Sequence, residues 1–130
     1  MIVLTMRTDR PQAELGLYSD GKEIAYDIWE AHRELSVTIH ERILTLLELN
    51  NIQLKNLEGI VCFKGPGSFT GLRIGLTVAN ALAFSLSKPV VSASGADWIT
   101  KGLSRLNKGD DEMIAMPEYG AEAHITQQLK

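Results

Sequence analysis

A glycine-rich turn is the stretch of this sequence whose residue types could do chemistry. Residues 65–71 read GPGSFTG and lead directly into an apolar run that continues to Leu86. Such a turn at the start of a helix can hold a phosphate, because the first N–H groups of a helix are unpaired and carry a partial positive charge. Ser68 or Thr70 could cap the helix, and Arg73 would add charge. The turn lacks the lysine of a phosphate-binding loop and the acid that accompanies a dinucleotide-binding turn.

The same glycines fit a second interpretation, in which they serve packing. Within a helix over residues 71–87, Gly71, Gly75 and Ala79 recur every four residues and form a ridge of small side chains. Glycine inside a helix costs about 1 kcal/mol relative to alanine, so Gly75 needs a reason, and close approach to a sheet is one. The opposite ridge is polar and aromatic with little charge, which is typical of a protein contact or of an exposed face with one phenylalanine. It consists of Arg73, Thr77, Asn80 and Phe84.

The elements around the turn predict one mixed α/β domain. Strands are expected at residues 1–6, 13–18, 23–29, 57–63 and 89–92. Helices are expected at residues 36–50, 71–87 and 94–106. The first three strands form a meander with Asp20–Gly21 in one turn, and the later strand, helix and strand form a βαβ unit with parallel strands. This order predicts a five-stranded mixed sheet with helices on its faces, the ribonuclease-H-like architecture that actin-like ATPases use twice.

The helix expected at 36–50 has an unusually wide apolar face. Ser36 is a candidate N-cap, and the apolar side chains that follow spread over about 180° of the helix, whereas one core face needs only about 100°. The excess width indicates a contact beyond the helix's own sheet. His40 lies within this arc and is interpreted as a histidine packed in an interface.

Composition limits the classes of function. The net charge of −3 argues against a chain that binds nucleic acid alone, and Cys62, the single cysteine, leaves no intramolecular disulfide. The apolar run at residues 74–86 is interrupted by polar residues and falls short of a membrane span, and no signal peptide is recognisable. We expect a cytoplasmic protein without membrane contact. The polar residues 107–111 predict a boundary between a domain at 1–108 and a short extension at 109–130, which could form a hairpin with strands at 113–116 and 121–126.

The stretch GPGSFTGLRIGLTVANALAFSLSKPVVSAS resembles the TsaB family, also called YeaZ. The motif from Gly65 to Gly75 is long and specific, and the resemblance covers about residues 1–106, most strongly 60–95. Members of this family are the bacterial partners of the TsaD subunit in making threonylcarbamoyladenosine beside the anticodon of tRNA. The resemblance implies the actin-like ATPase fold and an accessory subunit that binds and activates TsaD without being catalytic itself.

The resemblance also implies where the partner binds, because the helices at 36–50 and 70–87 would pack on the equivalent helices of TsaD. We therefore expect no catalytic residue, no metal site and no cofactor held by this chain alone, with ATP and metal on TsaD. A TsaE-like ATPase could join the complex, the chain alone could form a homodimer, and tRNA would be contacted only indirectly. The expected partner interface is Ile39, Ile43, Leu46, Leu47, Arg73, Leu76, Thr77, Asn80 and Phe84. The motif turn is Gly65, Pro66, Gly67, Ser68, Phe69, Thr70 and Gly71.

Three features depart from the family pattern. The family often has a histidine early in the first helix, whereas this chain has Ile39 in that place and His40 one position off. The first strand of the family usually ends in Asp-Thr-Ser, whereas this chain reads Met6-Arg7-Thr8, so the acid of a first phosphate loop is missing and Asp9 is displaced. Family members usually continue into a second domain, and this chain is expected to be a short form lacking most of it. Two alternatives stay open: a self-associating module of actin-like fold, or a weak nucleotide-binding enzyme that uses the GPGSFTG turn.

Overall fold

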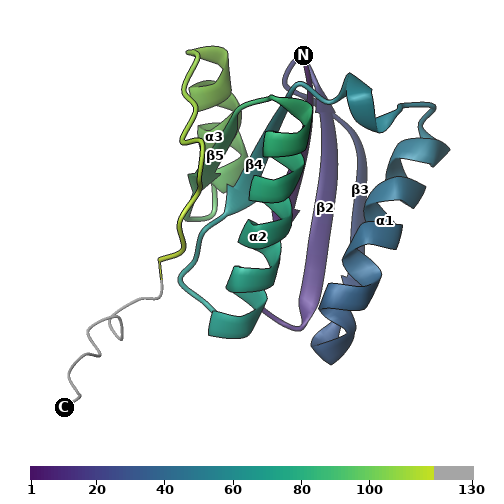
Figure 1. Cartoon of the computed structure of the whole chain (residues 1–130), viewed down its shortest axis with the longest axis vertical. Helices are drawn as coiled ribbons and strands as arrows, with labels where there is room; N and C mark the ends of the chain where they lie inside the picture. Colours follow the sequence, from purple (N-terminus) through teal and green to yellow (C-terminus); the bar gives the residue numbers. More distant parts are fainter. Residues whose placement is uncertain (119–130) are drawn as a thin grey trace.

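Five strands form one mixed sheet in the computed structural model, which describes residues 1–118 (Figure 1). The strands are β1 (Ile2–Arg7), β2 (Gln12–Ser19), β3 (Lys22–Glu30), β4 (Gly59–Phe63) and β5 (Val90–Ala93). Their order is β3-β2-β1-β4-β5. β1 pairs antiparallel with β2 and parallel with β4, β2 pairs antiparallel with β3, and β4 pairs parallel with β5. The predicted meander, βαβ unit and five-stranded mixed sheet are confirmed.

Local sequence explains how the sheet is built. Asp20 and Gly21 both have positive φ, of 50° and 84°, which is the backbone that a tight hairpin between β2 and β3 requires. Every residue of β4 is buried, as expected for a central parallel strand covered on both faces.

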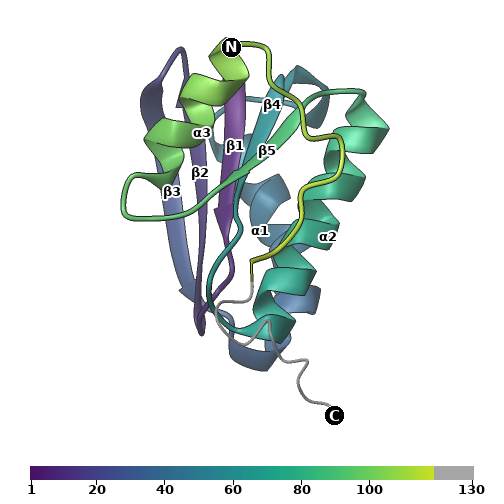
Figure 2. The same cartoon turned by 90° about the vertical axis from the view of Figure 1, so that its left-hand side faces the viewer.

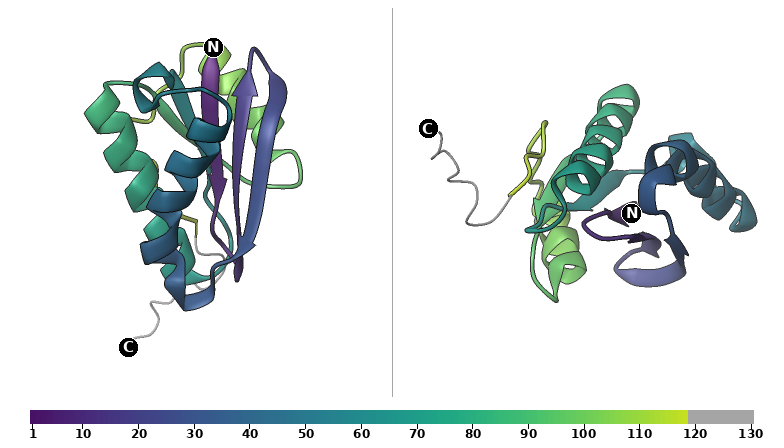
Figure 3. Two further views of the ribbon diagram at one scale, coloured as in Figure 1. Left: turned by 90° about the vertical axis from the view of Figure 1, so that its right-hand side faces the viewer. Right: turned by 90° about the horizontal axis from the view of Figure 1, so that it is seen from below.

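Three α-helices cover the two faces of the sheet. They are α1 (Leu35–Leu49), α2 (Phe69–Leu86) and α3 (Trp98–Asn107), with short 3-10 turns at His32–Glu34 and Leu54–Asn56. α1 and α2 lie on one face and α3 lies on the other (Figures 2 and 3). α1 begins at Leu35, one residue before the predicted start, and the predicted N-cap was wrong, because Glu34 and not Ser36 precedes the helix. α3 begins at Trp98 and not at residue 94, because Gly95 adopts a φ of +93°.

Alternation along β4 divides its side chains between the two helical layers. Phe63 points toward α3, because its ring packs edge-on against that of Trp98, with the ring centres 5.7 Å apart. Val61 points the same way, because a β-carbon added to Gly102 of α3 would overlap with its side chain. Ile60 and Cys62, which are fully buried, therefore face α1 and α2.

α2 is the one helix among the described residues that is long and apolar enough to cross a membrane, by length and composition alone. The sequence prediction concerned only the run at residues 74–86, which is part of this helix. One such helix is weak evidence for a membrane protein, because the core helix of a soluble protein passes the same test. α2 packs on β1, β4 and β5 in this fold.

The described part of the C-terminal extension follows α2 and β5 without joining the sheet (Figures 1 and 2). Residues 113–116, predicted to be the first strand of a hairpin, form no strand. The expected second strand at 121–126 lies outside the described residues.

Candidate functional site

The GPGSFTG turn is packed against the loop between β1 and β2. The backbone N–H of Ser68 donates to the carbonyl oxygen of Asp9 at 2.9 Å. The side-chain oxygen of Ser68 accepts from the N–H of Gly71 at 3.4 Å, so Ser68 caps α2, one of the two predicted caps. A β-carbon on Gly67 would overlap with that of Asp9. Two N–H groups that an anion would need at this turn are thus used within the chain.

Of the remaining motif residues, Gly65 packs against the chain, whereas Phe69 and Thr70 are exposed to solvent. Gly65 has a φ of +113°, precedes a cis peptide bond to Pro66, and lies so close to the backbone of Glu118 that a side chain would not fit. Phe69 is 54% exposed, and the Arg73 guanidinium lies 5.2 Å from the centre of its ring. Thr70 is exposed beside them.

The small-residue ridge of α2 lies directly over the end of β1. The hydroxyl of Thr8 donates to the carbonyl oxygen of Gly71 at 2.7 Å. β-Carbons added to Gly71 or Gly75 would overlap with Thr8, and Ala79 is fully buried one turn further on. The packing interpretation of the glycines is therefore confirmed.

The acid nearest to the turn is engaged in an ion pair. Asp9 accepts from Nε and Nη2 of Arg7 at 2.7 and 3.2 Å. The same guanidinium lies 3.9 Å from the centre of the Phe63 ring, and the Asp9 side chain is only 9% exposed. This carboxylate is therefore engaged within the chain by the planar guanidinium of Arg7.

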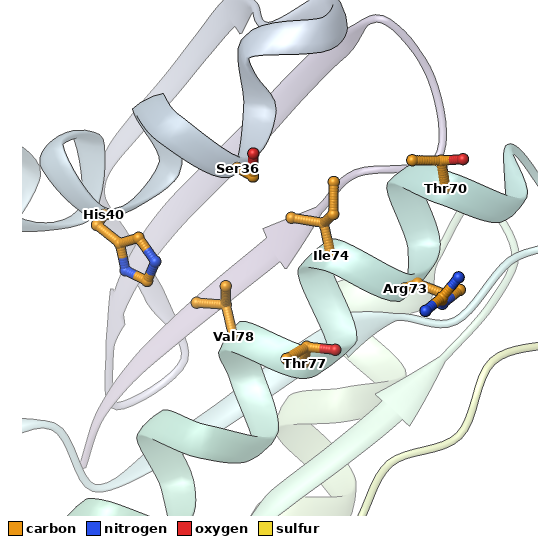
Figure 4. A pocket seen from close by; sticks show the side chains of 7 residues that line it. All are labelled: Ser36, His40, Thr70, Arg73, Ile74, Thr77 and Val78. Carbon is orange, nitrogen blue, oxygen red and sulfur yellow. The ribbon is translucent and has the colours of Figure 1, made fainter.

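A groove separates α1 from α2 on the outside of the molecule. Figure 4 shows His40 of α1 directed toward Val78 of α2, with Ile74 beside it, whereas Arg73 and Thr77 lie on the outer side of α2. The first part of the groove has a volume of about 410 Å³ and is lined by Ser36, His40, Thr70, Arg73, Ile74, Thr77 and Val78. A second part of about 220 Å³ shares two of these residues and is lined by His40, Ile43, Leu44, Leu54, Val78, Ala81 and Leu82.

The predicted partner interface needs a correction, because the fold buries five of its nine residues. Ile39, Ile43, Leu46, Leu47 and Leu76 are between 0% and 6% exposed. The four residues on α1 face the sheet at β2 and β3, and Leu76 on α2 also faces inward. These side chains therefore form part of the chain's own core. The excess width of the apolar arc is real but belongs to other residues, namely Val37 and Leu44, which are 70% and 56% exposed.

Only part of the outer ridge of α2 is exposed to solvent. Arg73, Thr77 and Phe84 are exposed, Phe84 to 87%. The fourth predicted residue, Asn80, is bound within the chain: its Nδ2 donates to the carbonyl oxygen of Ala115 at 3.0 Å, and its Oδ1 accepts from the N–H of Ala115 at 2.8 Å. No pattern of residues predicted this contact, because the two residues are 35 positions apart. His40, interpreted as packed, is instead exposed and lines the groove.

A part-buried polar network lies on the α3 side of the sheet, away from this groove. Tyr26 donates to Glu14 at 2.6 Å, and Arg10 donates to the other carboxylate oxygen of Glu14 at 2.7 Å. Burial and the Glu14 contact raise the pKa of Tyr26, while burial and Glu23 raise the pKa of Tyr18 to about 12. Within residues 1–118, no group of three or more His, Cys, Asp or Glu side chains could hold a metal ion. The network is structural, and the exposed groove is the candidate site.

Comparison with known proteins places this fold in a family. Residues 29–109 match the family model described as TsaD, tRNA N6-adenosine threonylcarbamoyltransferase. The tRNA threonylcarbamoyladenosine biosynthesis protein TsaB of Bacillus subtilis is 33% identical over 99 residues, which are 76% of this chain and 43% of the relative. The protein of the same name from Escherichia coli is 30% identical over 129 residues, or 95% of this chain and 53% of the relative.

A solved structure agrees with these relatives. The structure of YeaZ from Pseudomonas aeruginosa has a TM-score of 0.69 and 25% identity, and the match covers 83% of this chain and 50% of that one. The chain spans about half the length of the curated relatives it matches. Its fold is the actin-like, ribonuclease-H-like domain that the sequence predicted. The chain thus belongs to the family that the TsaD model describes and, within it, to the TsaB (YeaZ) group.

Proposed function

We propose that this chain is a non-catalytic subunit that binds a TsaD-type enzyme and activates it for threonylcarbamoyl transfer to the adenosine beside the anticodon of tRNA. The names of its relatives support a role in tRNA threonylcarbamoyladenosine biosynthesis. The match to the TsaD model supports a partner with a related fold, against which equivalent helices can pack.

The observation that carries the proposal is the exposed apolar surface over α1 and α2. Among the large hydrophobic side chains that are exposed within residues 1–118, five lie on these two helices: Val37, Leu44, Leu49, Phe69 and Phe84. Leu44 is the one of these five that lines the groove, beside Ile43, Ile74, Val78, Ala81 and Leu82. An apolar groove on the outside of a protein is the kind of surface that marks a contact with another molecule.

The shape of the groove suits a helix of the partner. α1 and α2 lie side by side over the same face of the sheet (Figure 3), with Ile74, Val78 and Leu82 along one wall at spacings of four residues. A helix that lays its apolar side into a groove is recognised through such regular anchors. Two helices from each protein would then form a bundle.

The lining of the groove supports an accessory role. His40 and Arg73 are its ionisable side chains, and no carboxylate lines either part of it. General acid–base catalysis needs a positioned donor and acceptor, and a groove of this composition supplies binding. In this proposal ATP and metal belong to the TsaD-type partner.

The test is co-purification of this chain with the TsaD-type enzyme of the same organism by size-exclusion chromatography, with and without ATP. We expect a stable complex at micromolar concentration and an increase in threonylcarbamoyl transfer to tRNA when the chain is added. A homodimer that ignores the enzyme would replace the proposal by self-association. Stabilisation of the chain alone by ATP against heat would favour the nucleotide-binding alternative.

A further inference from the structure

Arg73 is the one charged residue along the whole of α2. The other residues of this 18-residue helix are apolar or uncharged, and none of the positions three or four residues away from Arg73 is acidic. The guanidinium of Arg73 lies beside the ring of Phe69, 5.2 Å from its centre. The helix itself therefore provides no carboxylate for this exposed cation.

The rest of the described chain does not neutralise Arg73 either. Four arginines each form an ion pair with an acidic side chain, namely Arg7, Arg10, Arg42 and Arg105. Within residues 1–118, Arg33 and Arg73 are the two arginines without such a pair. Arg33 lines neither part of the groove, whereas Arg73 lines the first part. Arg73 is thus an unpaired cation at the candidate site.

Polarity changes along the groove between α1 and α2. Its first part combines Arg73 with three hydroxyl side chains, those of Ser36, Thr70 and Thr77. Its second part is lined by His40 and otherwise by apolar side chains. In Figure 4 the Arg73 guanidinium lies on the outer side of α2, away from His40. A molecule that fills both parts therefore meets an apolar end and a polar end with a positive charge at its rim.

The unpaired charge at the rim limits the chemistry of the occupant. A helix laid in the groove takes water away from Arg73, and removing water from an unpaired charge is costly. The partner must therefore supply an acceptor, and a carboxylate matches the planar fork of a guanidinium. No acid of this chain lines either part of the groove, so this carboxylate comes from the partner.

We propose that the helix with which the TsaD-type partner enters the groove carries an aspartate or glutamate that pairs with Arg73, next to apolar side chains that fill the second part. The inference rests on the proposed function and names the chemistry of the partner at that site. The pair fixes the register of the partner helix. Sliding the helix along the groove would move its carboxylate onto apolar lining and leave Arg73 without an acceptor.

The experiment measures association and dissociation rates between this chain and the TsaD-type enzyme of the same organism by surface plasmon resonance, in about 10 mM and about 1 M salt. Arg73→Glu changes an exposed side chain, and a glutamate early in a helix suits the helix dipole, so the variant should fold. We expect it to weaken binding about tenfold or more in low salt, chiefly through slower association, and much less in high salt.

Lys108→Glu is the matched control, because it makes the same change in net charge at an exposed lysine directly after α3, on the other face of the sheet. The control should bind as the unchanged chain does. The net charge of −3 makes this comparison sharp, since the overall field of the chain would attract a basic partner and an acidic one is attracted only locally.

Compensation identifies the carboxylate on the partner. Each exposed Asp and Glu on the helices of the enzyme is changed in turn to Lys and tested against both forms of this chain. We expect one such enzyme variant to bind Arg73→Glu more tightly than the unchanged enzyme does, and to bind the unchanged chain more weakly.

Three results would overturn the inference while the proposed function stands: full binding by Arg73→Glu, an equal loss from Lys108→Glu, or a complete set of enzyme variants none of which restores binding to Arg73→Glu. An unchanged chain that fails to bind the unchanged enzyme at micromolar concentration would overturn both the inference and the proposed function.

Discussion

Oγ1 of Thr8 occupies the place that a β-carbon on Gly75 would take. The same oxygen donates to the carbonyl oxygen of Gly71 one turn earlier, at 2.7 Å. A threonine at the end of β1 thus sets how closely α2 approaches the sheet. Gly71 and Gly75 are explained by this approach, without any bound phosphate.

Gly75→Ala should destabilise the chain by about 1–3 kcal/mol, because the new methyl group overpacks against Thr8. The direction of the change in stability is informative, because replacing glycine by alanine within a helix otherwise stabilises a protein by about 1 kcal/mol. Urea unfolding measures the free energy. The loss should shrink in a Thr8→Ala background, and a more stable Gly75→Ala chain would show that the helix is not held against β1.

Thr77→Glu should leave the free energy of unfolding within about 0.5 kcal/mol of the original, because the side chain is exposed. It should weaken binding to the TsaD-type enzyme at least about tenfold, because it buries an unpaired charge in the contact. Pull-down and calorimetry measure the loss. The matched control is Thr100→Glu, an exposed threonine on α3, at the other face of the sheet; equal losses from both would place the contact elsewhere.

Asn80 no longer belongs with Thr77 as a simple surface position. Asn80→Glu should release residues 110–118 from α2, because a carboxylate cannot donate to the carbonyl oxygen of Ala115. We expect faster proteolysis within residues 110–118 while the helical circular dichroism signal stays unchanged. An unaltered cleavage pattern would show that the contacts of Glu112 alone hold this segment in place.

Stability should fall at alkaline pH. Burial and Glu23 raise the pKa of Tyr18 to about 12 from the ordinary value of 10.0, and burial with the Glu14 hydrogen bond raises that of Tyr26. The folded chain therefore keeps protons that the unfolded chain releases, so this stability is complete below pH 10 and is lost as the pH rises from about 10 toward 12. Urea midpoints across this range measure the effect, and Tyr18→Phe should flatten the curve relative to the unchanged chain.

Cys62 should resist thiol reagents in the folded chain. It is fully buried, and burial raises the pKa of its thiol. Since the thiolate is the reactive form, labelling by a disulfide reagent should be slow in buffer and fast in denaturant. Rapid labelling of the native chain would show frequent opening of the central sheet.

The strands and the small-residue ridge of α2 could be predicted because alternation and helical spacing act locally. The five core residues that were assigned to the interface could not be placed in this way. The spacing of Ile39 and Ile43 shows that they lie on the apolar arc of α1, but it does not show which part of that arc packs on the sheet. The choice depends on the position of α1 over β2 and β3. The contact between Asn80 and Ala115 could not be predicted for a different reason. The Asn80 side chain binds the backbone of residue 115, and every residue type offers the same carbonyl group there.

The carboxylates of Asp111 and Glu112 also decide how copies of this chain can meet. A sheet edge with free N–H groups is a template for pairing with another sheet, and natural proteins cover such edges to avoid aggregation. Here the N–H groups of Val90 and Ser92 already face carboxylate oxygens of the same chain. A second copy therefore finds no open strand at β5 to extend, and this end of the sheet is closed to edge-to-edge pairing.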